Sequence, residues 1–133
     1  MNNKLTLIIF ILIVCLSGLM MFGFLTNSEG WGADYAGFIT QAMSIIEGNP
    51  REYTESNRFT IEKSTEPMGP IAYPWGYPLL LAPIYKLFGL NFLALKSVAA
   101  ISYLLFLGLF WFVFREDHSP IWFLFLLGLF AFN

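Results

Sequence analysis

Asp34 is a carboxylate placed where it could act on a substrate held in a membrane. It lies in the run Trp31-Gly32-Ala33-Asp34-Tyr35, shortly after a long apolar stretch and at the expected N-cap of an amphipathic helix. As a cap it would accept a backbone N–H bond and stabilise the helix by about 1 kcal/mol. A helix N-terminus also favours an ionised carboxylate, which can act as a general base or bind a metal ion. The two roles are compatible.

A stretch dense in proline and aromatic residues forms the second place where a ligand could be held. It reads Tyr73-Pro74-Trp75-Gly76-Tyr77-Pro78. Each proline fixes φ, and Gly76 permits an unusual backbone angle or the close approach of a ligand. Tyr73, Trp75 and Tyr77 are therefore candidate binding residues. The alternative is an aromatic belt at the level of the lipid headgroups.

Composition indicates a membrane protein and excludes several other classes. Hydrophobic residues make up 57% of the 133 residues and charged residues only 12%, whereas soluble domains have about 25% charged residues. The net charge of −2 and the absence of a basic patch argue against nucleic-acid binding. His118 is the only histidine and Cys15 the only cysteine, so the sequence predicts neither a zinc site nor an intrachain disulfide.

Three apolar runs predict an all-α membrane protein with several spans. They give a first span over about 5–25, a second over about 92–114 and a truncated third over about 120–133. About 20 residues cross the hydrocarbon core, so the third run predicts that the chain is the N-terminal part of a longer multi-span protein. The first run could instead be a signal peptide, and the third could instead lie in the interface. Lys96 is expected to extend to the interface from the start of its span.

Basic residues beside the spans predict the orientation of the chain. Lys4 precedes the first span and Arg115 follows the second, and positive charges favour the cytoplasmic side. We therefore expect a multi-pass protein of the cell membrane with a cytoplasmic N-terminus. The segment over about 26–91 would then be a long extracytoplasmic loop.

The pattern within this loop predicts two surface helices around a charged segment. The first runs from Asp34 to Glu47 and ends at Gly48-Asn49-Pro50, which is typical of a helix C-terminus. The second runs from Pro78 to Phe88 with a kink at Pro83. The apolar face of the first helix is expected to lie in the membrane interface or to pack on other protein, and the second helix is expected to be interfacial or re-entrant. The intervening segment 51–66 shows no sustained period and is expected to be solvated and mobile, with a short strand at Thr60-Ile61-Glu62. The apolar face expected of the first helix consists of Tyr35, Phe38, Ile39, Ala42, Met43, Ile45 and Ile46, and its polar face of Gly37, Thr40, Gln41 and Ser44.

The order of these elements resembles the GT-C membrane glycosyltransferases. Within that group it is most similar to the aminoarabinose-lipid A transferase and the relatives of the protein O-mannosyltransferases. The resemblance covers nearly the whole chain but only the first part of the family fold. It rests on Gly32-Ala33-Asp34-Tyr35, on Ala42-Met43-Ser44-Ile45-Ile46-Glu47-Gly48-Asn49-Pro50, on Tyr73-Pro74-Trp75-Gly76-Tyr77-Pro78-Leu79-Leu80-Leu81-Ala82-Pro83 and on Leu87-Phe88-Gly89.

The resemblance implies transfer of a sugar from a polyprenyl-phosphate donor to a lipid, glycan or protein acceptor outside the cytoplasm. The acidic residue that the family needs for transfer would be Asp34. Tyr73, Trp75 and Tyr77 would contact substrate. Arg58 and Lys86 would stabilise the departing phosphate, with Arg51 and Lys63 as further candidates.

The chain departs from the family pattern at two positions. Tyr35 stands where many members have a second carboxylate, which weakens a metal role at this site and leaves a divalent cation an open question. Trp75 stands where the family often has proline. No other cofactor is implied. Two alternatives from other classes stay open: a transporter component and a small membrane adaptor without catalysis.

Overall fold

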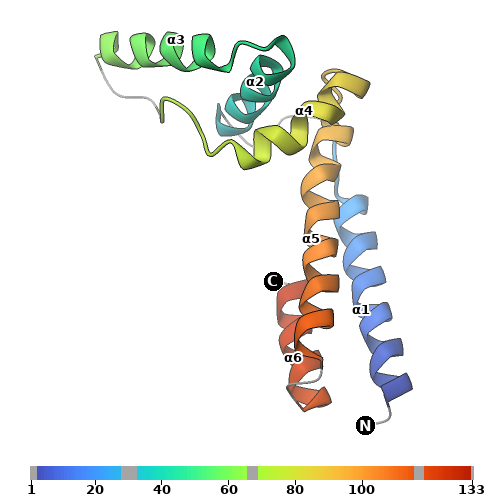
Figure 1. Cartoon of the computed structure of the whole chain (residues 1–133). Coiled ribbons are helices and arrows are strands. Elements are labelled where there is room, and N and C mark those ends of the chain that lie inside the picture. Colours follow the sequence, from blue (N-terminus) through green and yellow to red (C-terminus); the bar gives the residue numbers. More distant parts are fainter. Residues whose placement is uncertain (1–2, 28–32, 66–68, 116–118, 133) are drawn as a thin grey trace. The chain divides into compact units, whose positions relative to one another are not determined.

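The structure is a computed structural model that describes residues 3–27, 33–65, 69–115 and 119–132 (Figure 1). Within these ranges the chain forms six α-helices and no strand, which confirms the all-helical prediction. The chain divides into two compact units, and each is described by itself. Unit 1 comprises Met1–Leu25 and Lys96–Asn133, and unit 2 comprises Thr26–Leu95.

Unit 1 is built from three apolar helices in antiparallel succession. These are α1 (Asn3–Gly23), α5 (Phe92–Phe114, which belongs to this unit from Lys96 onward) and α6 (Pro120–Ala131). Phe10 of α1 stacks on Trp111 of α5 with ring centroids 4.3 Å apart. Trp111 in turn meets Phe123 of α6 edge to face. Aromatic packing thus joins all three helices at one level.

Towards its C-terminal end, α1 carries two small residues that let it approach α5 and α6 closely. Ser17 is buried, and its hydroxyl donates to the Ala131 carbonyl at 3.2 Å, which satisfies an acceptor at the end of α6. At Gly18 a Cβ atom would lie 3.4 Å from a methyl group of Leu104 on α5. Small side chains at such contacts are typical of helices that pack in a membrane.

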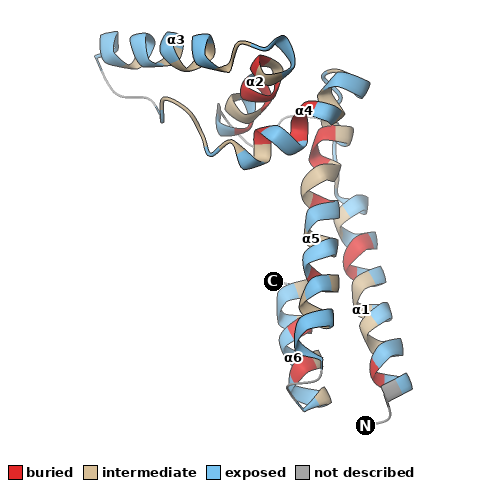
Figure 2. Cartoon of the chain, viewed as in Figure 1, coloured by how far each residue is buried: buried red, intermediate tan, exposed pale blue. Residues whose placement is uncertain are grey.

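Much of the surface of the unit 1 helices is exposed (Figure 2), and many of the exposed side chains are large and apolar. Leu19 is 73% exposed and Phe112 is 69% exposed. Two helices, Lys4–Gly23 and Phe92–Phe114, are long and apolar enough to cross a membrane by length and composition, whereas α6 is shorter. The bounds of α5 are those predicted, and α1 begins and ends two residues before its predicted bounds. The link at 116–118 lies outside the described residues.

Lys96 differs from its expected environment. It lies near the start of α5, as predicted, but only 4% of its surface is exposed. Its side chain is therefore buried by protein and does not extend outward as the snorkelling prediction required.

Unit 2 is organised around α2 (Ala33–Glu47), which packs against both α3 (Pro50–Lys63) and α4 (Gly76–Phe88). The predicted end of α2 is confirmed. Gly48 has φ +75°, and the Asn49 amide donates to the Ser44 carbonyl at 2.9 Å. This is a Schellman motif, which needs a residue that tolerates positive φ. Pro50 then begins α3 at its first helical position.

The buried face of α2 is not the purely apolar face predicted. Tyr35, Ile39 and Ala42 are buried, but so are Gln41 and Ser44, which had been assigned to the polar face. Ser44 satisfies its hydroxyl by donating to the Gln41 carbonyl at 2.8 Å. Gln41 bonds to the segment before α4, as described below. Packing on both sides of α2 thus buries polar side chains that have partners.

The segment after Asn49 is the clearest error of the sequence prediction. It forms helix α3, and the strand predicted at Thr60–Glu62 lies within its last turns. No residue of α3 is buried, so the expectation of a solvated segment is confirmed. The helix contains few apolar residues, and it relies on a proline start and on good helix formers such as Glu and Arg.

Helix α4 begins at Gly76, two residues before the predicted start, and continues through Pro83 to Phe88. Pro78, Leu81 and Ala82 are buried, whereas Leu79, Leu80 and Leu87 on the other side are exposed. Gly89 ends the helix with φ +61°. After Leu90, Asn91 caps α5 by accepting the Ala94 amide at 3.1 Å.

Candidate functional site

Tyr73 is held against α2 by its own backbone. The Gln41 side chain donates to the Tyr73 carbonyl at 3.0 Å and accepts the Tyr73 amide at 2.8 Å. Gln41 is fully buried, so its amide has no water to exchange for these bonds. A further bond joins the same segment to α3, because the Asn57 amide donates to the Ile71 carbonyl at 3.1 Å. The extended segment before α4 is therefore fixed from two helices.

The Tyr73 ring lies over Gly37 and against Phe38. A Cβ atom at Gly37 would lie only 2.5 Å from the Tyr73 Cε2 atom, so this ring position requires glycine. The Phe38 ring lies 4.6 Å from the Tyr73 ring and meets Tyr77 edge to face at 5.2 Å. These distances are typical of favourable aromatic pairs. We refer to Asp34, Gly37, Phe38, Gln41, Tyr73 and Tyr77 as the Tyr73 cluster.

The Tyr73 hydroxyl donates to Asp34 Oδ1 at 2.5 Å. This bond joins two residues that are 39 positions apart in the sequence. Asp34 is exposed and lies within the first turn of α2, since the helix already begins at Ala33. The N-cap prediction is therefore wrong by position, although the carboxylate keeps its place at the positive end of the helix. Trp31 and Gly32 lie outside the described residues.

The bond to Asp34 raises the pKa of Tyr73 above its ordinary value of 10.0, with smaller contributions from partial desolvation and from the Asp34 charge. Tyr73 therefore stays protonated and remains a donor at neutral pH. Because the folded-state pKa is raised, the contribution of this bond to stability is present below pH 10 and is lost as the pH rises through the raised value. Burial raises the pKa of Tyr77 as well, and an interaction with the Tyr35 side chain opposes that shift.

The arrangement supplies an exposed carboxylate whose orientation is fixed by one neutral donor. An exposed carboxylate can accept a proton from a hydroxyl or amine that approaches it. Among the described residues, no group of three or more His, Cys, Asp or Glu side chains could hold a metal ion.

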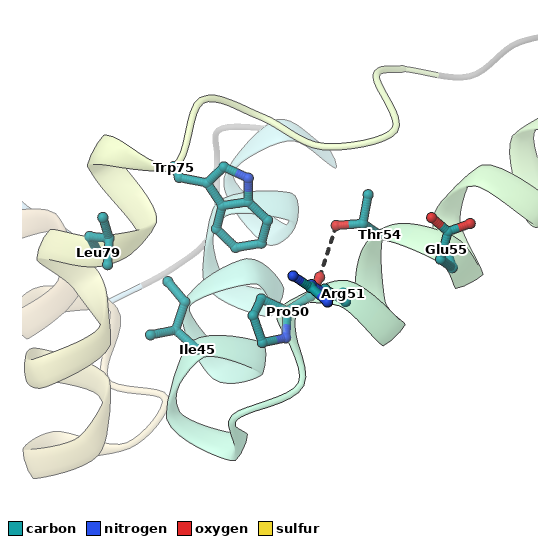
Figure 3. A pocket seen from close by; sticks show the side chains of 7 residues that line it. All are labelled: Ile45, Pro50, Arg51, Thr54, Glu55, Trp75 and Leu79. Carbon is teal, nitrogen blue, oxygen red and sulfur yellow. Dashed lines mark hydrogen bonds between the residues drawn. The ribbon is translucent and has the colours of Figure 1, made fainter.

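Trp75 lies in a separate open groove of about 710 Å³, together with Ile45, Pro50, Arg51, Thr54, Glu55 and Leu79 (Figure 3). The walls come from the end of α2, the first turns of α3 and the start of α4. Asp34 is not among the lining residues. Asp34 and Ile45 are 11 positions apart on one helix, or roughly 16 Å along its axis.

The two cations predicted to bind substrate lie outside the Tyr73 cluster. Arg58 is on the exposed surface of α3, where its Nε atom lies 3.8 Å from Glu55 Oε2. Lys86 is exposed in the last turn of α4. Of the predicted site residues, the structure thus brings together Asp34, Tyr73 and Tyr77, and it places Trp75 in the groove.

Sequence reasoning missed Gly37 and Gln41 as parts of the site. The signal that could have found them is their spacing. Asp34, Gly37, Gln41 and Ser44 recur at intervals of three and four residues, so they form one stripe of small and polar residues along a helix. A stripe of this kind can accept another segment of chain at close range.

Comparison of the chain with models of protein families, with curated proteins and with solved structures finds no match. The class that the structure defines is therefore a broad one. It is an all-helical protein with two helices that could span a membrane and a separate helical unit between them in the sequence.

Replacing Gly37 with alanine tests the geometry of the cluster. The added Cβ displaces the Tyr73 ring, so we expect the hydroxyl to leave Asp34 and the pKa of Tyr73 to fall toward 10.0. Stability should change little, because alanine favours the helix by about 1 kcal/mol over glycine and this offsets part of the lost contacts. Ultraviolet titration of Tyr73, assigned by difference with a Tyr73→Phe variant, measures the shift.

The matched control is Gly76→Ala, also in a helix of unit 2, where a Cβ would meet nothing within 4 Å. This variant should leave the titration of Tyr73 unchanged. A Tyr73 pKa that is the same in the Gly37→Ala variant as in the wild type would contradict the close packing of the ring on α2.

Proposed function

We propose that this protein is an integral-membrane glycosyltransferase that moves a sugar from a polyprenyl-phosphate donor to an acceptor outside the cytoplasm. The observation that carries the proposal is the hydrogen bond between Tyr73 and Asp34. It joins two of the four stretches on which the resemblance to the GT-C glycosyltransferases rests, although they lie far apart in the sequence. A contact between them is expected if both belong to one site.

The proposed chemistry uses Asp34 as the general base. Its carboxylate accepts the proton of the acceptor hydroxyl or amine as the acceptor oxygen or nitrogen forms a bond to the anomeric carbon. The bond between that carbon and the phosphate oxygen breaks, and the polyprenyl phosphate leaves with the bonding electron pair. Tyr73 is a positioning residue, because it orients the carboxylate through a bond to one of its oxygens.

The departing phosphate requires positive charge. Arg58 and Lys86 stay proposed for this role, since both side chains are exposed and able to change conformation. In this proposal α1 and α5 span the cell membrane and hold the donor lipid, and unit 2 lies on the extracytoplasmic side.

A transfer assay tests the proposal directly. Membranes that contain the protein, expressed from its intact gene, are supplied with a labelled polyprenyl-phosphate sugar and with lipid extract, glycan or protein acceptors. We expect label to move to an acceptor only when the protein is present. If the label stays on the polyprenyl phosphate with every acceptor, or crosses the membrane without transfer, the proposed reaction is wrong.

A further inference from the structure

The groove around Trp75 has the size and composition of a ligand site. Its volume of about 710 Å³ falls in the range of small-molecule pockets, roughly 300–1,000 Å³. Ile45, Trp75 and Leu79 supply apolar surface, and the Trp75 ring faces the end of α2 and the start of α3 (Figure 3). A ligand with a largely apolar body suits these walls.

The edge of the groove carries one basic and one acidic side chain. Arg51 and Glu55 both line it, but the Glu55 carboxylate lies 3.8 Å from Arg58 on the same helix. Within the described part of the chain, no carboxylate lies within ion-pair distance of Arg51. The Thr54 hydroxyl is also occupied, since it donates to the Pro50 carbonyl at 2.8 Å. The Arg51 guanidinium is thus the group left to bind an anion.

The apolar wall of the groove continues onto an exposed face of α4. Leu79 lines the groove, and Leu80 and Leu87 extend the same side of the helix, with exposed fractions of 57%, 53% and 74%. Only the short link Gly89–Asn91 separates α4 from the candidate span Phe92–Phe114. A link of that length spans at most about 14 Å, so the chain keeps α4 close to the end of that helix and to any bilayer it enters.

We propose that the groove binds an anionic phospholipid of the surrounding bilayer. The phosphate pairs with Arg51, and part of an acyl chain lies along Ile45, Trp75 and Leu79. This inference rests on the proposed membrane location but not on sugar transfer. A failure of the transfer assay would therefore leave it standing, and a failure here would leave the transfer reaction standing.

Quenching of Trp75 fluorescence by brominated lipids tests the proposal. The full chain carries phenylalanine in place of Trp31, Trp111 and Trp122, and is reconstituted in phosphatidylcholine vesicles. Brominated phosphatidylglycerol or brominated phosphatidylcholine is then added at the same mole fraction. We expect phosphatidylglycerol to be preferred about fivefold, as one basic group near an anionic surface would give. Equal quenching by the two lipids would overturn the proposal.

Two matched pairs of variants locate the site. Arg51→Gln should remove the preference, and Lys63→Gln, which removes the same charge at the other end of α3, should retain it. Leu79→Ser should weaken quenching by brominated phosphatidylglycerol, and Phe59→Ser, which changes an exposed apolar residue of α3 outside the groove, should not. If the preference for phosphatidylglycerol survives Arg51→Gln, the proposed site is wrong. The same conclusion follows if the two variants of either pair lower the measured quantity equally.

A final experiment distinguishes binding of a whole lipid from binding of its phosphate headgroup alone. Glycerol phosphate, which has the anion but no acyl chain, should leave the quenching unchanged. If it removes the preference, the groove is a site for small anions and the lipid proposal fails.

Discussion

Replacing Asp34 with asparagine is expected to lower the rate of sugar transfer by about 100-fold to 10,000-fold, the usual contribution of a general base. Asparagine has nearly the same shape, and its oxygen can still accept the Tyr73 hydroxyl, so the cluster should keep its geometry. The loss would fall on kcat more than on KM, because the base acts only as the acceptor attacks. Transfer of labelled sugar by the reconstituted protein measures both constants.

The controls separate a base from a structural residue. Glu47→Gln removes a carboxylate from the opposite end of α2 and should leave transfer unchanged. Tyr73→Phe removes the hydroxyl that orients Asp34 and should cost less than Asp34→Asn, since the carboxylate itself remains. Retention of more than a third of wild-type transfer in Asp34→Asn would show that Asp34 is not the base.

The apolar helices could be predicted from the sequence because the length and position of each apolar run are sufficient to identify the helix. A run of apolar residues between polar ends sets both the existence and the ends of α5, and the asparagine before it supplies the cap. The end of α2 was equally readable, because Gly48 has a conformation that other residues rarely adopt. In these places local chemistry and the final fold agree.

Helix α3 and the burial of Gln41 could not be predicted in the same way. Helix α3 contains few apolar residues, so its helix-forming residues had to be weighed without an extended apolar run to mark the helix. Gln41 looks like a solvent-facing residue on a helical wheel. Its burial follows from a segment 32 positions away whose backbone it satisfies, and no local pattern records that contact.

The candidate site also combines features that the sequence predicts with features that depend on tertiary packing. The chemical types at Asp34, Tyr73 and Tyr77 could be read from their motifs, but the partnership of Asp34 with Tyr73 needed the packing of two segments on one helix. The aromatic turn also proved not to be a single binding surface. Tyr73 and Tyr77 face Phe38, while Trp75 between them lines the groove. Adjacent motif residues can therefore serve different sites.

Gln41→Leu is expected to release the segment that carries Tyr73. Leucine fills a similar volume but leaves both the amide and the carbonyl of Tyr73 without their partners. Each unsatisfied buried group costs about 1–3 kcal/mol. The Tyr73 backbone is only partly buried, so water can replace some of the loss, and we expect a total cost of about 2–3 kcal/mol. Hydrogen exchange of the segment from Gly69 to Trp75 should become roughly 100-fold faster.

Met43→Leu on the same helix is the matched control. This substitution conserves volume and should cost less than about 1.5 kcal/mol, with no effect on exchange at Gly69 to Trp75. The Gln41→Leu variant should also reduce sugar transfer, because Tyr73 would no longer hold Asp34 in one orientation. If exchange in this segment stays at the wild-type rate, the aromatic contacts with Phe38 are sufficient to hold Tyr73, and the bonds from Gln41 do not position the site.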